Sequence, residues 1–231
     1  MTDRREVTCR RWRATFLVLA SLASLTWAFA GVLNPAMSQL HAFVSEYSAR
    51  DQPWRYLFQT TDVIMGTLLC LAGLATLVWA RHRPLGRQGW SGVGFVAGGF
   101  FSVLDALVTM DCSPTRSQAC MAAEEAGHVS VNHIVHVGTS TIVVVGFALP
   151  ILLLNSTMTR FRGFGLVVRW AWVVFTLLNG IGAVGWFVGT PMDYTGIWQR
   201  FSLGLGTLWW LILAADDIVT ARVQDRALLL S

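Results

Sequence analysis

The sequence predicts an all-α, polytopic membrane protein with six transmembrane helices and with its N and C termini in the cytoplasm. Three observations predict this fold class: the composition, six long apolar segments and an uneven distribution of arginine. Of the 231 residues, 54% are hydrophobic and only 13% are charged. A soluble domain needs more charge than this to cover its surface, so the composition places the chain among membrane proteins.

The six apolar segments are each long enough, at roughly 20 residues, to cross the hydrocarbon core of a bilayer as a helix. They are Ala14–Leu33, Leu57–Ala80, Ser91–Met110, Ile134–Leu154, Leu166–Val188 and Trp198–Ile218. Helices are expected because backbone groups in lipid must satisfy their hydrogen bonds within one segment. The segments are too long for barrel strands and lack their alternating pattern. We expect one transmembrane domain over residues 1–231, with the lipid bilayer as its main partner.

Arginine sets the predicted orientation. The chain has 17 basic residues, all of them arginine, and a net charge of +4. Thirteen of them would lie on one side of the membrane: Arg4, Arg5, Arg10, Arg11, Arg13, Arg81, Arg83, Arg87, Arg160, Arg162, Arg169, Arg222 and Arg226. The other side would hold Arg50, Arg55, Arg116 and Arg200. The richer side is cytoplasmic by the positive-inside rule, so we expect a multi-pass protein of the bacterial plasma membrane. Because these arginines flank apolar segments and form no basic patch, we expect no nucleic-acid partner.

The first span also has features of a signal peptide. Arginines precede its apolar run, and Ala28-Phe29-Ala30 resembles a cleavage site. The run continues through Gly31-Val32-Leu33, however, and so exceeds the usual length of about 7–15 residues. We predict that the first helix is retained, with cleavage after Ala30 as the alternative.

Three segments would connect the spans on the outer side: Asn34–Tyr56, Asp111–His133 and Gly189–Ile197. In the first, the apolar spacing from Met37 to Val44 predicts a short amphipathic helix at the membrane interface. The second contains Cys112 and Cys120, which we expect to form a disulfide in an oxidising compartment. A metal pair is the alternative for these two cysteines.

Two acidic pairs flank the membrane. Asp216 and Asp217 end the last span close to Arg222, and Glu124 and Glu125 lie in the second outer segment. We interpret both pairs as surface charge.

The remaining polar residues gather in the outer half of the spans, where ionisable groups are costly and indicate function. They are Asp62 in the second span, Ser102 and Asp105 in the third, Asp111 just after it, His133, His136 and Ser140 in the fourth, and Arg200 in the sixth. Ser102 and Asp105 share one helix face, as do His133 and His136, because residues three apart are neighbours on a helix.

Three interpretations of these residues remain open. In the first, His133 and His136 bind zinc with Asp105, Asp62 or His128 as third ligand, and the metal generates a hydroxide. Asp105 would then be a ligand or general base, with Ser102 in support. In the second, the carboxylates of Asp62, Asp105 and Asp111 belong with Arg200 to a site for a head group or solute, or to a proton relay. In the third, the groups pair with one another and only lock the helix ends.

The order of several short motifs resembles the "domain of unknown function 998" family of bacterial membrane proteins. These motifs are Ser45-Glu46-Tyr47, Asp51-Gln52-Pro53-Trp54-Arg55-Tyr56-Leu57-Phe58, Asp62, Asp111-Cys112-Ser113-Pro114-Thr115, Cys120 and the helix with His133 and His136. The resemblance covers nearly the whole chain and implies a six-helix inner-membrane protein. It supplies no reaction, so no catalytic residue follows from it.

A second resemblance is to the intramembrane metal hydrolases that include alkaline ceramidases. Ser102, Asp105, His133 and His136 are similar in type to the serine, aspartate and histidine residues around their zinc. The chain departs from them in having six spans, not seven, and in lacking a terminal H-x-x-x-H motif.

The function predicted from the sequence is an integral plasma-membrane protein whose outer-leaflet site handles a lipid or lipid-like head group. A zinc-dependent intramembrane hydrolase is the first alternative, and a transport or accessory subunit is the second. Both enzymes and binding proteins are compatible with these residues.

Overall fold

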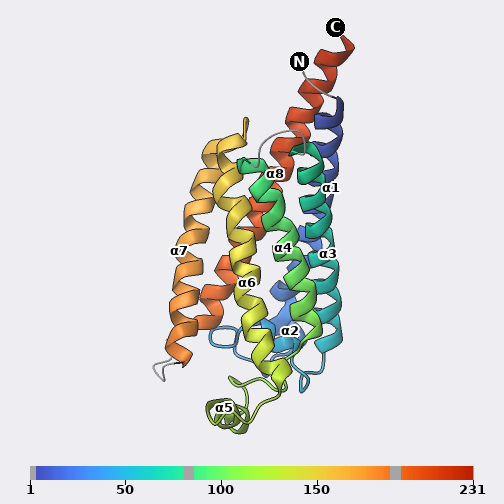
Figure 1. The fold of residues 1–231 in the computed structure, drawn as a ribbon. Helices are drawn as coiled ribbons and strands as arrows, with labels where there is room; N and C mark the ends of the chain where they lie inside the picture. The colour runs from blue at the N-terminus through green and yellow to red at the C-terminus, as the bar shows by residue number, and fades with distance from the viewer. Residues whose placement is uncertain (1–3, 81–85, 188–193, 231) are drawn as a thin grey trace.

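The computed structural model describes residues 4–80, 86–187 and 194–230, which fold almost entirely into helices (Figure 1). Arg81, Arg83 and residues 189–193 of the third predicted outer segment lie outside these ranges. Within the described residues, six helices are long and apolar enough to cross a membrane. The chain is therefore an all-helical, multi-pass membrane protein by the length and composition of its helices, as the sequence predicts.

Each spanning helix begins before its predicted apolar segment, because the residues that precede the segment continue the helix. These helices are α1 (Arg4–Ser24), α3 (Arg55–Ala80), α4 (Arg87–Leu107), α6 (Val131–Leu154), α7 (Arg162–Phe187) and α8 (Thr195–Leu229). Helix α8 also continues past the predicted end at Ile218, whereas α4 ends at Leu107, three residues before the predicted Met110. A 3-10 helix (Leu25–Phe29) and the short α2 (Ala30–Leu33) complete the first span. The shorter elements are α5 (Gln118–Glu125) and two 3-10 helices, Val44–Ser48 and Asn155–Thr157.

The helices pack as neighbours in a defined order. Helix α1 lies between α3 and α8, α4 lies between α3 and α6, and α7 packs on α8. The core between them holds fully buried large side chains such as Leu17, Phe95 and Trp209. The ring of Phe147 from α6 meets that of Trp210 from α8 edge to face, with 5.2 Å between ring centroids.

The two ends of the bundle differ. The start of α1 and the end of α8 lie together at one end, and α5 lies at the opposite end (Figure 1). We call these the termini end and the loop end. The shared position of the two termini fits an even number of spans, and the arginine distribution remains the basis for expecting the termini end in the cytoplasm.

Glycines allow α4 to approach both of its neighbours closely. A Cβ atom added to Gly94 would lie 2.7 Å from the Gly146 carbonyl oxygen of α6, and one added to Gly66 of α3 would lie 2.6 Å from the Gly99 carbonyl oxygen. Backbone contact of this kind is how helices associate in lipid. It brings the polar residues of α3, α4 and α6 into one region.

The predicted interfacial helix from Met37 to Val44 is wrong. Turns cover residues 35–42, and a 3-10 helix follows at Val44–Ser48. Met37 and Ala42 pack into a small core with Tyr47 and do not form a lipid-facing stripe. Two backbone carbonyls of the segment also bind side chains of α8, because Thr195 donates to His41 and Arg200 donates to Ala42.

Candidate functional site

The carboxylate of Asp105 lies at the centre of a polar cluster between α4 and α6. Ser140 Oγ donates to it at 3.0 Å from Oδ1 and 3.2 Å from Oδ2, and Thr139 Oγ1 donates to Oδ1. His136 Nδ1 lies 3.3 Å from Oδ1. The three α6 residues lie within one helical turn and therefore converge on the same carboxylate.

The ring of His136 has a defined proton position. Its Nδ1 lies 2.9 Å from the Val108 carbonyl oxygen and 3.1 Å from that of Asp105. Carbonyl oxygens only accept hydrogen bonds, so Nδ1 carries the proton and Nε2 of the neutral ring is an acceptor. Nε2 is buried, and no atom of the described chain is hydrogen-bonded to it. A buried acceptor without a partner is unusual and calls for an explanation.

Asp62 of α3 faces the same region. It lies one turn from Gly66, whose backbone packs against Gly99 and Ser102 of α4. The charge of Asp105 acts on the half-buried Asp62 carboxylate, and none of the hydrogen bonds of the described residues reaches this carboxylate. Ser102 is buried, and its Oγ has no hydrogen-bond partner in the ranges that the structure describes. Asp62, Ser102, Asp105 and His136 are called the intramembrane cluster below.

His133 and Asp111 form a second group closer to the loop end. The backbone N–H of Asp111 donates to His133 Nδ1 over 3.3 Å, which places the proton of the neutral ring on Nε2. The Asp111 carboxylate accepts hydrogen bonds from Ser130 N at 2.6 Å and Ser130 Oγ at 2.8 Å. Burial raises the pKa of Asp111, but these bonds and the charge of Arg50, 3.3 Å away, outweigh it and hold the pKa below its usual value.

Glu124 is not the solvated charge expected from the sequence. Its Oε1 lies 3.8 Å from His133 Nε2, and its Oε2 is buried. This contact places the Glu124 carboxylate of α5 beside the first turn of α6. Glu125, by contrast, is exposed as expected.

Arg200 is separate from the two groups of acids. One guanidinium nitrogen donates to the carbonyls of Ala42 and Gly196, both at 2.9 Å, and another donates to Tyr47 Oη at 3.3 Å. The structure therefore splits the set of residues singled out in the sequence. Asp62 and Asp105 belong together, Asp111 and His133 belong together, and Arg200 holds the Asn34–Tyr56 segment.

Glu46 was not among the residues singled out in the sequence, yet it is fully buried in the loop-end segments. Its carboxylate accepts hydrogen bonds from Phe43 N at 2.8 Å, Thr115 N at 3.1 Å, Thr115 Oγ1 at 2.6 Å and the hydroxyl of Ser113. Burial raises the pKa of Glu46, and the hydrogen bonds offset this only in part. The sequence did hold a signal for Glu46, because this residue lies in the Ser45-Glu46-Tyr47 motif that carries the family resemblance.

The predicted disulfide is confirmed. Cys112 and Cys120 are bonded, and their Cα atoms are 6.0 Å apart. The bond closes the loop that carries Ser113 and Thr115, so it holds the partners of Glu46 in place.

The residues of the predicted zinc site do not converge on one point. Among the described residues, no group of three or more His, Cys, Asp or Glu side chains could hold a metal ion. His136 has the orientation of a metal ligand, with Nδ1–H on a carbonyl and Nε2 available. His133 does not, because its Nε2 bears the proton, and His128 is exposed.

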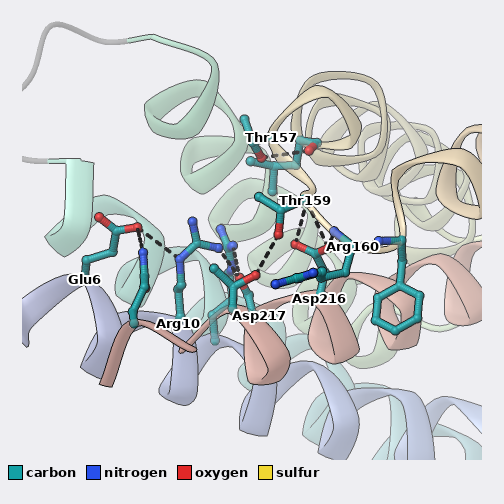
Figure 2. A network of polar contacts seen from close by, with 12 residues as sticks. Glu6, Arg10, Thr157, Thr159, Arg160, Asp216 and Asp217 are labelled. Atoms are coloured by element: carbon teal, nitrogen blue, oxygen red, sulfur yellow. Dashed lines mark hydrogen bonds and ion pairs between the residues drawn. The ribbon is translucent and has the colours of Figure 1, made fainter. Parts of the chain in front are cut away.

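A buried ionic network at the termini end overturns the interpretation of Asp216 and Asp217 as surface charge (Figure 2). Asp217 pairs with Arg13 and Arg10 of α1, and Arg10 also contacts Glu6 at 3.2 Å. Asp216 Oδ1 accepts hydrogen bonds from the backbone N–H groups of residues 159, 160 and 161. Residues far apart in sequence supply the charges, so the nearby Arg222 suggested the wrong partner.

Comparisons with known proteins give a family and no activity. No curated protein and no solved structure matches the chain. Residues 17–216 match the family described as "Protein of unknown function (DUF998)", a match that covers all or part of each of the six spanning helices and both described loop-end segments. The chain therefore belongs to the DUF998 family of proteins of unknown function.

Proposed function

We propose that the protein binds the polar head group of a lipid or lipid-like molecule at the intramembrane cluster. The observation that carries the proposal is the Asp62 carboxylate, which lies inside a spanning helix beside Asp105 with no hydrogen bond from the described chain. Ionisable groups at such positions are retained for function and normally have a partner. A ligand supplied from the bilayer would be that partner.

Two buried atoms support a ligand at this position. Ser102 Oγ and His136 Nε2 both lie in side chains that are less than 5% exposed, and neither has a hydrogen-bond partner in the described part of the chain. Buried polar groups are costly unless they are hydrogen-bonded. A polar head group would satisfy them together with Asp62.

The orientation that the arginine distribution predicts indicates in which leaflet the intramembrane cluster lies. With the termini end in the cytoplasm, the intramembrane cluster lies in the outer leaflet of the plasma membrane. The loop-end segments would then cover it from outside, anchored by Glu46 and by the disulfide.

Native mass spectrometry of the detergent-purified protein tests the proposal. We expect retained lipid in the wild type and its loss in the double variant Asp62→Asn plus Asp105→Asn. Asp225→Asn is the matched control, because this carboxylate lies at the termini end in an exposed pair with Arg11. Equal lipid retention in all three proteins would overturn the proposal.

A zinc-dependent hydrolase is the second candidate function, and the orientation of His136 favours it. Its test is the metal content of protein purified without chelator, with His133→Ala plus His136→Ala as the control. About one zinc per chain, lost in the double variant, would make the hydrolase the leading hypothesis. If the protein carries neither zinc nor lipid, a transport or accessory role becomes the better proposal. The Asn34–Tyr56 segment would then be the first place to seek a partner protein.

A further inference from the structure

The polar groups of the intramembrane cluster are mainly hydrogen-bond acceptors. The hydroxyl hydrogens of Thr139 and Ser140 are already donated to Asp105, and the Nδ1 proton of His136 is donated to backbone carbonyls. What remains is the Asp62 carboxylate, the hydroxyl of Ser102 and Nε2 of His136, which is an acceptor when the ring is neutral. A ligand that satisfies these groups must therefore bring hydrogen-bond donors.

The charge of the cluster points in the same direction. The charge of Asp105 acts on Asp62 as a like charge, and α3 packs tightly on α4 one turn away, where a Cβ atom at Gly66 would lie 3.0 Å from Ser102 Cβ. A positive charge beside two carboxylates relieves their repulsion. The arginines of the loop end do not supply that charge, because each is engaged elsewhere. Arg50 contacts Asp111, Arg55 donates to the Arg50 carbonyl, Arg116 donates to Gln52, and Arg200 donates to Ala42, Gly196 and Tyr47.

We infer that the head group bound at the intramembrane cluster carries a primary ammonium group, which Asp62 and Asp105 recognise by charge. This inference rests on the proposed function and names its ligand class. A primary ammonium has three N–H donors and a positive charge, so it matches both the acceptors and the two carboxylates. A quaternary ammonium has the charge but no N–H, and a phosphoglycerol head group has the opposite charge.

Lipid competition distinguishes these classes. The purified protein is placed in mixed micelles with equal amounts of phosphatidylethanolamine, phosphatidylcholine and phosphatidylglycerol, and the lipid retained is read by native mass spectrometry. We expect phosphatidylethanolamine to be retained about tenfold or more above phosphatidylcholine, the effect of losing one charge-assisted hydrogen bond. Asp62→Asn should lower this preference, and Asp225→Asn should leave it unchanged.

The possible results distinguish failure of the ammonium inference from failure of the proposed head-group binding. Retention of one of the other two lipids, lost in Asp62→Asn plus Asp105→Asn, would overturn the ammonium inference and keep head-group binding. Retention of all three lipids at similar levels, again dependent on the two aspartates, would do the same. No retained lipid in any sample would overturn both. A folded Asp62→Asn variant, checked by its thermal unfolding midpoint, keeps the comparison valid.

Discussion

Asp217 of α8 and Arg13 of α1 form a bidentate ion pair that is almost completely buried between the two helices. Arg13 Nε lies 2.6 Å from Oδ2 and Arg13 Nη2 lies 2.7 Å from Oδ1. Both arginines of the network, Arg10 and Arg13, also stack over the ring of Trp79, at 4.5 and 5.3 Å from its centroid. The network therefore joins three helices, α1, α3 and α8, at the termini end.

Removing Asp217 should destabilise the protein strongly. Asp217→Ala leaves the buried guanidinium of Arg13 without a carboxylate and leaves Arg10 with Glu6 alone. Breaking a buried pair costs about 3–5 kcal/mol. Thermal unfolding in detergent, followed by tryptophan fluorescence, measures the effect. Asp225→Ala is the matched control, since its pair with Arg11 is about half exposed and such pairs contribute about 0–1 kcal/mol. Equal shifts in the two variants would show that the buried network does not stabilise the bundle.

Asp216 should stabilise the start of α7 from a different helix. Its Oδ1 accepts three backbone N–H groups at 2.7 to 3.1 Å, just before α7 begins at Arg162. Negative charge at this position also favours the helix dipole. Asp216→Ala removes these hydrogen bonds, so the free energy that protects the amides of residues 159–161 should fall by about 1–3 kcal/mol. Amide hydrogen exchange of these residues should therefore be faster. Unchanged exchange there would contradict this role.

The sequence predicts the six spans well because length and apolarity alone decide them. It also names Asp105 and His136 together among the residues of one zinc site, and His136 Nδ1 does lie 3.3 Å from the Asp105 carboxylate. It does not predict the partners of Asp217, Glu46 or Arg200, which lie 204, 67 and 153 residues away in the chain. Such pairs depend on how the helices are arranged, and no local pattern encodes that arrangement.

The segment from Met37 to Val44, before α3, also shows that a local sequence pattern does not predict tertiary contacts. Its apolar spacing is typical of an interfacial helix, yet tertiary contacts decide its structure. Arg200 and Thr195 bind the carbonyls of Ala42 and His41, and the segment folds into turns around them. The apolar pattern therefore predicted the wrong backbone and also the wrong environment for Met37, which packs inside the protein and not against lipid.

Glu46 should make the stability of the loop-end segments depend on pH. Its pKa is raised in the folded protein, so its contribution is fully present below the ordinary glutamate pKa and is lost as pH rises through the raised pKa. Hydrogen exchange of residues 44–48 should therefore increase with pH beyond the intrinsic chemical rate. Glu46→Gln should abolish this increase, because the amide does not titrate.

Asp111 is the control, because its contribution to stability should depend on pH in the opposite direction. Its pKa is lowered in the folded protein, so its contribution is present above the ordinary aspartate pKa and is lost as pH falls through the lowered pKa. Asp111→Asn should change the acid side of the profile and leave the Glu46 effect in place. If both variants alter the same pH range, the two carboxyls do not act separately.

Gly99 should be the position where helix packing and ligand binding depend on each other. A Cβ atom at Gly99 would meet the Gly66 carbonyl and lie 2.7 Å from the Cys70 backbone nitrogen. Backbone atoms cannot yield as a flexible side chain can, so Gly99→Ala must push α3 away from α4. That shift moves Asp62 away from Ser102 and Asp105. We expect both a lower unfolding midpoint and loss of the retained lipid.

Gly180→Ala is the control for this substitution. Gly180 is an exposed position of α7, and a Cβ atom there would meet nothing within 4 Å. Alanine is a better helix former than glycine by about 1 kcal/mol, so this variant should keep or raise the unfolding midpoint and retain lipid as the wild type does. If Gly99→Ala lowers the midpoint but retains lipid fully, the ligand does not depend on the α3–α4 contact. The intramembrane cluster would then be the wrong place to seek it.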